Sequence, residues 1–305
     1  MQALGATNAR MPAFQVRMHS SMKIGIVGLG LIGGSLGLAL RSHGHTVLGV
    51  SRQAQTCQRA IARGAVDDAS LSFTLMATVD VVFLCTPLAA MQATVVALKS
   101  HLAPETVLTD VGSVKGWVVE TIAPLWSNFV GGHPMAGTAE SGIEAAQPDL
   151  FVNAAYVLTP TETTPIAAVQ RIEDLVRPLQ TRLYHCTPDD HDRAVAWISH
   201  LPVMASASLI AACREETDPA VLALAQMLAS SGFRDTSRVG GGNPELGVMM
   251  AQYNQAALTR SLHTYRDQLN AVITHVEHAD WRSLAALLKQ TQQGRSDFLR
   301  ERGKG

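Results

Sequence analysis

The 305-residue chain has few aromatic residues, almost no net charge and no clustered cysteines, and each scarcity excludes a class of function. Aromatic residues make up 5% of the sequence, too few for a surface that stacks nucleic-acid bases. The 24 Lys and Arg residues nearly balance the 25 Asp and Glu residues, and a formal net charge of -1 attracts neither nucleic acid nor an anionic membrane. Any anion must therefore bind at a local site.

The four cysteines are widely separated in the chain. Cys57, Cys85, Cys186 and Cys213 form no CxxC pair and no cluster with histidine. This spacing is typical of reduced thiols and predicts neither a disulfide framework nor a zinc site. We therefore expect a cytoplasmic protein without a bound metal. A chain of this length that is 47% hydrophobic can form one or two domains with a buried core.

Residues 24–40 form an uncharged stretch that follows several basic residues, as a signal peptide would. Six glycines interrupt this stretch, and it is shorter than the roughly 20 residues that span a bilayer. We therefore expect neither secretion nor a membrane partner. Residues 1–21 lack clear periodicity and are expected to form a disordered tail, with Met22 as an alternative start.

Short apolar runs alternate with helix-length segments in the first part of the chain. The runs are KIGIV (23–27), TVLGV (46–50), VDVVFLC (79–85), TVLTD (106–110), NFVGG (128–132), AYVLTP (155–160) and TRLYHC (181–186). This alternation predicts βαβ units and a largely parallel sheet, with helices on both faces because the runs are apolar throughout. The predicted fold is an α/β, Rossmann-type domain over residues 22–186.

From Thr187 onward the pattern is helical. Helices are predicted over 189–213 with a kink at Pro202, over 219–231 with Gly232 as the C-terminal cap, and over 244–278 and 280–301. Helices this apolar expose more hydrophobic surface than one small bundle can bury. We therefore expect an all-helical second domain over 187–305 that also forms a homodimer.

A GxGxxG motif ends the first predicted strand and opens a helix. Its residues are Gly28, Leu29, Gly30, Leu31, Ile32 and Gly33. In this context the glycines permit a tight turn and close approach of a pyrophosphate to the helix N-terminus. The motif predicts a dinucleotide site; the alternative is a glycine-rich turn without a ligand.

The end of the second predicted strand bears on the choice of cofactor. An acidic residue there would bind the ribose 2′-hydroxyl of NAD, whereas this chain has Ser51 and Arg52, with Thr56 just beyond. A guanidinium and two hydroxyls suit the 2′-phosphate of NADP. A solvated loop arginine is the alternative.

Two further loops follow later strands, at the edge where ligands bind in open α/β sheets. His133, in GGHPMAG, is suited to remove a proton at neutral pH, and Ser113, in DVGSVK, could bond the imidazole or a substrate hydroxyl. The alternatives are a structural histidine and a serine that caps the following helix. His191 and His200 could line the same cleft or be core histidines.

Residues 232–244 are predicted to form a polar, glycine-rich connection that carries Arg234 and Arg238. Arginine pairs with carboxylates through two parallel hydrogen bonds, so such a loop could close over a carboxylate substrate. A solvated loop is the alternative.

In combination these motifs resemble the prephenate/arogenate dehydrogenase family, and most closely its NADP-dependent arogenate dehydrogenases of cyanobacterial type. The matching stretches are KIGIVGLGLIGGSL, VSRQ, FLCTP, TDVGSVK, GGHPMAG, AVAWISHLPVM and SSGFRDTSRVGGGNPELG. The resemblance implies a Rossmann-type domain followed by a helical dimerisation domain. It also implies cofactor contacts at Cys85, Thr86 and Pro87, and substrate contacts at Ser113, His133, His200, Arg234 and Arg238.

The activity implied by the resemblance is oxidative decarboxylation of a cyclohexadienyl ring, with His133 as the base, Ser113 orienting the hydroxyl and Arg238 binding a carboxylate. Arogenate would give L-tyrosine, and prephenate would give 4-hydroxyphenylpyruvate. No motif distinguishes these two substrates. A non-enzymatic NADP-binding regulator and another Rossmann oxidoreductase are the remaining alternatives.

Overall fold

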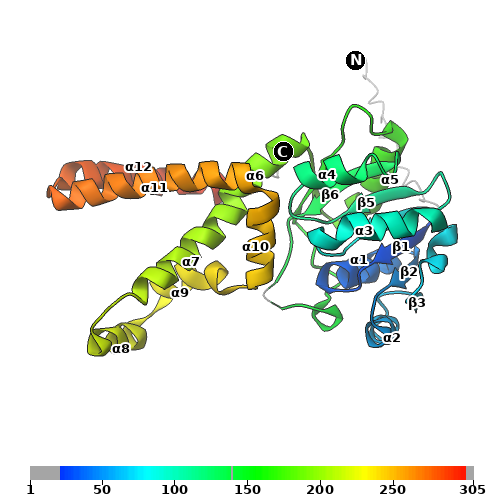
Figure 1. The fold of residues 1–305 in the computed structure, drawn as a ribbon, viewed down its shortest axis with the longest axis horizontal. Helices are drawn as coiled ribbons and strands as arrows, with labels where there is room; N and C mark the ends of the chain where they lie inside the picture. The colour runs from blue at the N-terminus through cyan, green and yellow to red at the C-terminus, as the bar shows by residue number, and fades with distance from the viewer. Residues whose placement is uncertain (1–20, 139, 300–305) are drawn as a thin grey trace, which may run out of the picture.

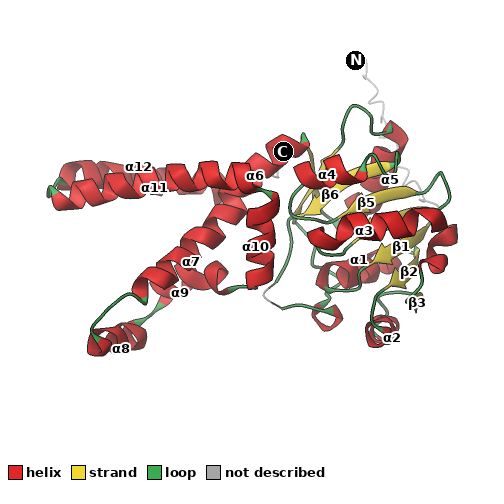
Figure 2. Cartoon of the chain, viewed as in Figure 1, coloured by secondary structure: helices red, strands yellow, loops and turns green. Residues whose placement is uncertain are grey.

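The computed structural model describes residues 21–138 and 140–299. A sheet domain is followed by helices that form two diverging arms, one built from α7 to α9 and the other from α11 and α12 (Figure 1). The helix α10 lies between the arms, next to the sheet domain (Figure 2). The expected N-terminal tail falls almost wholly outside the described residues.

One eight-stranded sheet, in the order β3-β2-β1-β4-β5-β6-β7-β8, forms the first domain. All neighbouring strands are parallel except β6 and β7, which are antiparallel. The largely parallel sheet predicted from the sequence is thus confirmed. The strands are β1 (Lys23–Val27), β2 (Thr46–Val50), β3 (Asp68–Ser70), β4 (Val81–Leu84), β5 (Val107–Asp110), β6 (Phe129–Pro134), β7 (Ala155–Thr159) and β8 (Arg182–His185).

Helices cover both faces of the sheet because successive strand residues point to opposite faces and both sets are apolar. In β4, Val81 and Phe83 join one core with α1 and α5, whereas Val82 and Leu84 join a second core with α3 and α4. The helices of this domain are α1 (Leu31–Ser42), α2 (Ala54–Ala62), α3 (Leu88–Leu98), α4 (Gly116–Ile122) and α5 (Ile166–Val176), with 3₁₀ turns at Phe73–Thr78, Lys99–His101, Ile143–Ala145 and Arg177–Leu179.

The second part of the described chain is entirely helical. Its elements are α6 (Pro188–Val195), a π-helical turn (Ala196–His200), α7 (Leu201–Cys213), α8 (Pro219–Leu228), α9 (Ser231–Ser237), a 3₁₀ turn (Arg238–Gly241), α10 (Pro244–Tyr253), α11 (Gln255–Glu277) and α12 (Trp281–Leu299). The irregularity expected at Pro202 takes the form of the π-helical turn that precedes it.

By length and composition alone, the continuous helical segment Pro188–Cys213, which comprises α6, the π-helical turn and α7, could cross a membrane. Its polar residues argue for a packed protein helix instead. His191 and Asp192 are buried and hydrogen-bond to the sheet domain, and buried Ser206 accepts a hydrogen bond from the amide of Gly240. A lipid-facing helix would leave such groups without partners.

Three expectations for the helical part were wrong. Gly232 does not cap a helix, because α8 ends at Leu228 and Gly232 lies inside α9. The connection over 232–244 is not an open loop, since α9 and a 3₁₀ turn fill most of it. The helix predicted over 244–278 breaks at Asn254, whose backbone leaves helical geometry while its side chain bonds to the backbone of Asp192 and the ring of His200.

Candidate active site

The carboxyl ends of β1, β4, β5 and β6 meet at one edge of the sheet because these strands are parallel. The register aligns Val27 with Leu84, and Leu84 with Asp110. The glycine turn after β1, the loop after β4, the loop after β5 and the end of β6 therefore face the same space. The parallel topology alone brings these distant segments together.

The turn after β1 has the geometry of an anion-binding helix N-terminus. Gly28 has a φ of +104°, and a side chain there would collide with the backbone of Cys85. Gly30 is the N-cap of α1, makes no side-chain cap, and has open space where a Cβ would lie. The first turn of α1 also lacks acidic residues. Free amides and the helix dipole therefore favour a phosphate here.

The residues after β4 complete a cradle that fits a dinucleotide. Cys85 and Thr86 lie directly against Gly28, and the buried hydroxyl of Thr86 has no hydrogen-bond partner in the part of the chain that the structure describes. A buried polar group without a partner is costly, and a bound ligand would supply one. The main-chain and hydroxyl groups at this edge could thus hold a pyrophosphate and the adjoining sugar.

No carboxylate follows the end of β2. Ser51 is half-buried and Arg52 is exposed, and residues 51–66 contain no Asp or Glu. The Ser51 hydroxyl accepts the amide of Gln53 at 3.3 Å, and the Thr56 hydroxyl donates to the side-chain oxygen of Gln53 at 3.3 Å. The residues that the sequence assigned to a 2′-phosphate therefore gather around the start of α2.

His133 lies in β6 and is buried, with 9% of its surface exposed. Its Nδ1 is 2.8 Å from Nε2 of His191 in α6, and Nδ1 of His191 is 2.7 Å from Oδ1 of Asp192. The two histidines and the carboxylate thus form a hydrogen-bond chain that joins the sheet to the first helix of the helical domain.

Asp192 also binds the N-terminus of α4. Its two carboxylate oxygens accept the amides of Lys115 at 2.7 Å and Gly116 at 2.8 Å. The helix α4 has no side-chain cap from its own N-cap residue, Lys115. The carboxylate therefore supplies the negative charge that a helix N-terminus favours. This arrangement excludes the alternative that Ser113 caps the helix.

A buried charge pair, formed by Lys115 and Asp110, binds the residue that precedes His133. The ammonium of Lys115 bonds the Asp110 carboxylate and the carbonyl of Gly132, and both charged side chains are fully buried. Asp110 also accepts the amides of Gly112 at 2.7 Å and Gly132 at 3.0 Å. Burial lowers the pKa of Lys115, against the opposing effect of Asp110. The pair fastens the loop after β5 to the residue that precedes His133.

These surroundings keep His133 neutral. Burial lowers the pKa of His133 well below its usual value, and the nearby ammonium of Lys115 acts in the same direction. A neutral imidazole at neutral pH can accept a proton.

One ring nitrogen of His200 has no hydrogen-bond partner within residues 21–138 and 140–299. The Asn254 amide donates to the backbone carbonyl of Asp192 at 2.8 Å and lies 3.2 Å from Nδ1 of His200. Because that amide nitrogen is a donor, Nδ1 of His200 accepts and Nε2 carries the hydrogen. Nε2 is buried without a partner among the described residues, and burial lowers the pKa of the ring to about 4. His200 is therefore a neutral ring with a buried donor on Nε2.

The other predicted substrate residues lie outside this chain of hydrogen bonds. Ser113 is half-buried on the loop after β5. Arg234 and Arg238 are exposed, on α9 and the turn after it, which pack against α7. Arg234 pairs with its neighbour Asp235. Within one chain the arginines thus belong to an arm of the helical domain.

Sequence reasoning missed Asp110, Lys115, Asp192 and Asn254. Asp110 carries a local signal, because it is a charged residue at the end of the apolar strand VLTD, whereas Asp192 lies in the polar run DDHDR and carries none. A buried charge is seldom found without a partner, so such residues invite a search for one.

Taken together, the glycine turn, the parallel sheet and the neutral histidine at its carboxyl edge define a nucleotide-dependent oxidoreductase with a helical second domain. Two family profiles match the chain: "Prephenate dehydrogenase, nucleotide-binding domain" over residues 36–185 and "Prephenate dehydrogenase, dimerization domain" over residues 187–290. The chain belongs to the prephenate dehydrogenase family.

Individual relatives agree with this assignment. Prephenate dehydrogenase of Bacillus subtilis is 31% identical over 289 residues, which cover 91% of this chain and 76% of that protein. Cyclohexadienyl dehydrogenase of Zymomonas mobilis is 29% identical over 277 residues, which cover 89% of this chain and 94% of that protein. The crystal structure of Synechocystis arogenate dehydrogenase superimposes with a TM-score of 0.83 at 54% identity, and covers 91% of this chain and 100% of that one.

The lowered pKa of His200 predicts a loss of stability in acid. Between pH 6.5 and pH 4 the unfolded chain takes up a proton on this residue that the folded chain refuses, so the free energy of unfolding falls as pH falls through this window. The full effect is about 3 kcal/mol. Urea unfolding at pH 7.5 and pH 4.5 should show that wild type loses about 2 kcal/mol more than His200→Asn. Equal losses in the two proteins would contradict the assignment.

Proposed function

We propose that the protein catalyses the NADP-dependent oxidative decarboxylation of L-arogenate to L-tyrosine. The observation that carries this proposal is a neutral, buried His133 at the sheet edge that the glycine turn shares, in a chain 54% identical to an arogenate dehydrogenase. The family assignment supplies the reaction type, and the site supplies a base where the reaction needs one.

In the proposed mechanism the imidazole of His133 takes the proton of the ring C4 hydroxyl. The nicotinamide, when bound, supplies the acceptor for the hydride that leaves C4. The ring carboxylate departs as CO₂, its bonding electrons complete an aromatic ring, and the proton taken by His133 returns to the phenolate oxygen. The protein contributes position and a buried base that is neutral before the reaction.

Three other residues are proposed to hold the substrate. The Nε2–H of His200 can donate to a substrate oxygen, because no residue in the described part of the chain accepts it. Ser113 lies on the loop next to Lys115 and can orient the C4 hydroxyl. The guanidinium of Arg238 has no ion-pair partner among the described residues, so it is available to a substrate carboxylate.

Prephenate is the second candidate substrate, since the Bacillus subtilis relative is a prephenate dehydrogenase. The two substrates differ only in an amine or a ketone on the side chain, far from the carbon that is oxidised. The identity to the Synechocystis enzyme favours arogenate.

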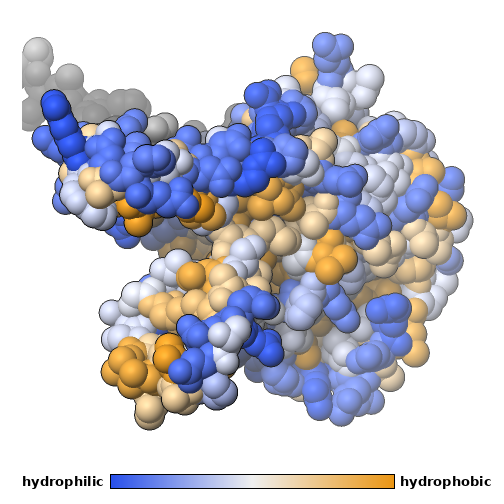
Figure 3. Space-filling model, turned by 60° about the vertical axis from the view of Figure 1, so that its left-hand side comes forward, coloured by the Kyte–Doolittle hydropathy of each residue, from blue (hydrophilic) through white to orange (hydrophobic). Residues whose placement is uncertain are grey.

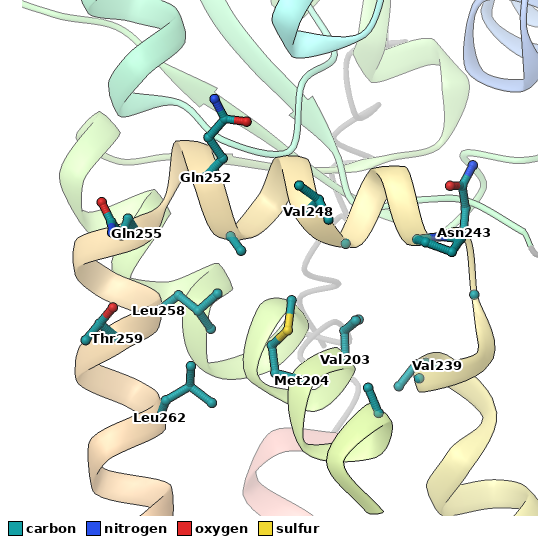
Figure 4. A pocket seen from close by; sticks show the side chains of 16 residues that line it. Val203, Met204, Val239, Asn243, Val248, Gln252, Gln255, Leu258, Thr259 and Leu262 are labelled. Carbon is teal, nitrogen blue, oxygen red and sulfur yellow. The ribbon is translucent and has the colours of Figure 1, made fainter. Parts of the chain in front are cut away.

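We also propose that two chains pair through the apolar surfaces of the helical arms. Side chains on α8 remain exposed in the single chain, among them Val221, Leu224, Met227 and Leu228. Apolar residues gather at the end of the arm that carries α8 and around the hollow between the arms (Figure 3). A pocket of about 700 Å³ in that hollow is lined by Val203 and Met204 of α7 and Leu258 and Leu262 of α11 (Figure 4). Such surfaces are typical of a dimer seam.

Steady-state rates test the proposed activity most directly. Arogenate with NADP should give the highest kcat/KM among the four combinations of arogenate or prephenate with NADP or NAD. His133→Asn should bind NADP normally and lose at least about 100-fold in kcat, as expected for removal of a general base. Near-normal turnover in that variant would remove His133 as the base, and turnover with neither substrate would exclude the activity.

Arg52 is proposed to select NADP through its charge on the 2′-phosphate. Arg52→Ala should lower kcat/KM with NADP by about tenfold or more, the expected effect of losing one charge-assisted contact, and leave kcat/KM with NAD nearly unchanged. Arg59→Ala, an exposed arginine later in α2, is the matched control and should leave both values as in wild type. An unchanged NADP/NAD ratio in Arg52→Ala would contradict the assignment.

A further inference from the structure

We propose that His191 and Asp192 are positioning residues that fix the proton of His133 on Nδ1 and so leave Nε2 free to take the proton of the substrate. The inference rests on the proposed role of His133 as the base and deepens it. It assigns two residues of the helical domain to a reaction whose base lies in the sheet domain.

The first link is the carboxylate of Asp192. Its Oδ2 accepts the amide of Gly116 at 2.8 Å, and its Oδ1 accepts the amide of Lys115 at 2.7 Å. Backbone N–H groups can only donate, so both oxygens act as acceptors. The remaining group on Oδ1 is Nδ1 of His191 at 2.7 Å, and it must donate as well. Asp192 thus fixes a hydrogen on Nδ1 of His191.

The second link follows from the first. A neutral His191 with its hydrogen on Nδ1 has a lone pair on Nε2, which lies 2.8 Å from Nδ1 of His133. Nδ1 of His133 therefore donates to His191. A neutral His133 with its hydrogen on Nδ1 has none on Nε2, and this is the tautomer that a base acting through Nε2 requires.

The opposite polarity would require a positively charged His191 that donates from Nε2 to His133. That ring is almost completely buried, and its charge would join the buried ammonium of Lys115 in one cluster. The opposite polarity would also leave the hydrogen of His133 on Nε2, so that Nε2 could not accept the proton of the substrate.

The same chain stabilises the product of the proton transfer. Burial and the ammonium of Lys115 oppose the protonation of His133, whereas His191 and His200 are neutral rings. When Nε2 takes the substrate proton, Nδ1–H of His133 still donates to His191, which still donates to Asp192. The new imidazolium is therefore two hydrogen bonds from a carboxylate, and no other proton needs to move.

Two amide substitutions at His191 separate this role from a merely structural one. His191→Asn keeps a donor within reach of Asp192 but is too short to meet His133. His191→Gln extends far enough for its oxygen to accept Nδ1–H of His133 and does not depend on Asp192. We expect kcat to fall about 100-fold or more in His191→Asn and less than about tenfold in His191→Gln, with the Kd for NADP unchanged in both.

If His191 serves only to hold the Asp192 carboxylate on the N-terminus of α4, the order reverses and Asn preserves activity better than Gln. That order, or wild-type kcat in both variants, would overturn the proposal. His185→Phe, at an exposed histidine of β8 that pairs with Glu173, is the matched control and should retain wild-type kcat. Thermal melting of each variant verifies that the protein is folded before its rate is compared.

The double variant His133→Asn/His191→Asn separates this inference from the proposed function. If His191 acts through His133, the double variant is no slower than His133→Asn alone. A further loss of about 100-fold in the double variant would show that His191 acts independently and would overturn the inference. Near-normal turnover of His133→Asn would instead refute the base itself, on which the inference depends.

Discussion

The rest of the site depends on the hydrogen bonds that the carboxylate of Asp192 accepts. This carboxylate lies on α6 of the helical domain, yet it accepts the two amides at the N-terminus of α4 in the sheet domain. Oδ1, which accepts the amide of Lys115, also accepts a hydrogen bond from Nδ1 of His191. Nε2 of His191 in turn hydrogen-bonds to Nδ1 of His133. One charged group therefore docks the two parts of the chain and orients the proposed base. A change in that docking would alter the chemistry without touching the cofactor turn.

The buried pair of Lys115 and Asp110 fixes the loop after β5 against β6. Removing two charges from water costs free energy, and the pair offsets this cost through hydrogen bonds to the backbone of Gly112 and Gly132. These bonds connect the loop after β5 to β6, directly beside His133. The ammonium also makes protonation of His133 unfavourable. The structure thus uses a costly buried charge to keep a nearby imidazole neutral and fixed in place.

Much of the sheet domain could be predicted because its signals are local. Runs such as Val81–Leu84 are apolar on both faces, and the glycine turn follows its strand directly. The strand β3 escaped prediction because its three residues are polar or small. The break at Asn254 and the role of Asp192 escaped for another reason: they depend on tertiary hydrogen bonds between residues far apart in the chain, such as Lys115 and Asp192. The hydrophobic periodicity of the sequence does not predict such pairs.

The pH dependence of kcat/KM tests the central claim that His133 is held as a neutral base. Burial and the nearby ammonium of Lys115 lower the pKa of His133, so the unprotonated ring should persist below pH 6.5. The account predicts that kcat/KM stays constant from pH 8 to pH 6.5 and reaches half of that value only at a lower pH. A half-maximal value at or above pH 6.5 would contradict it, because the base would then titrate like a histidine in water.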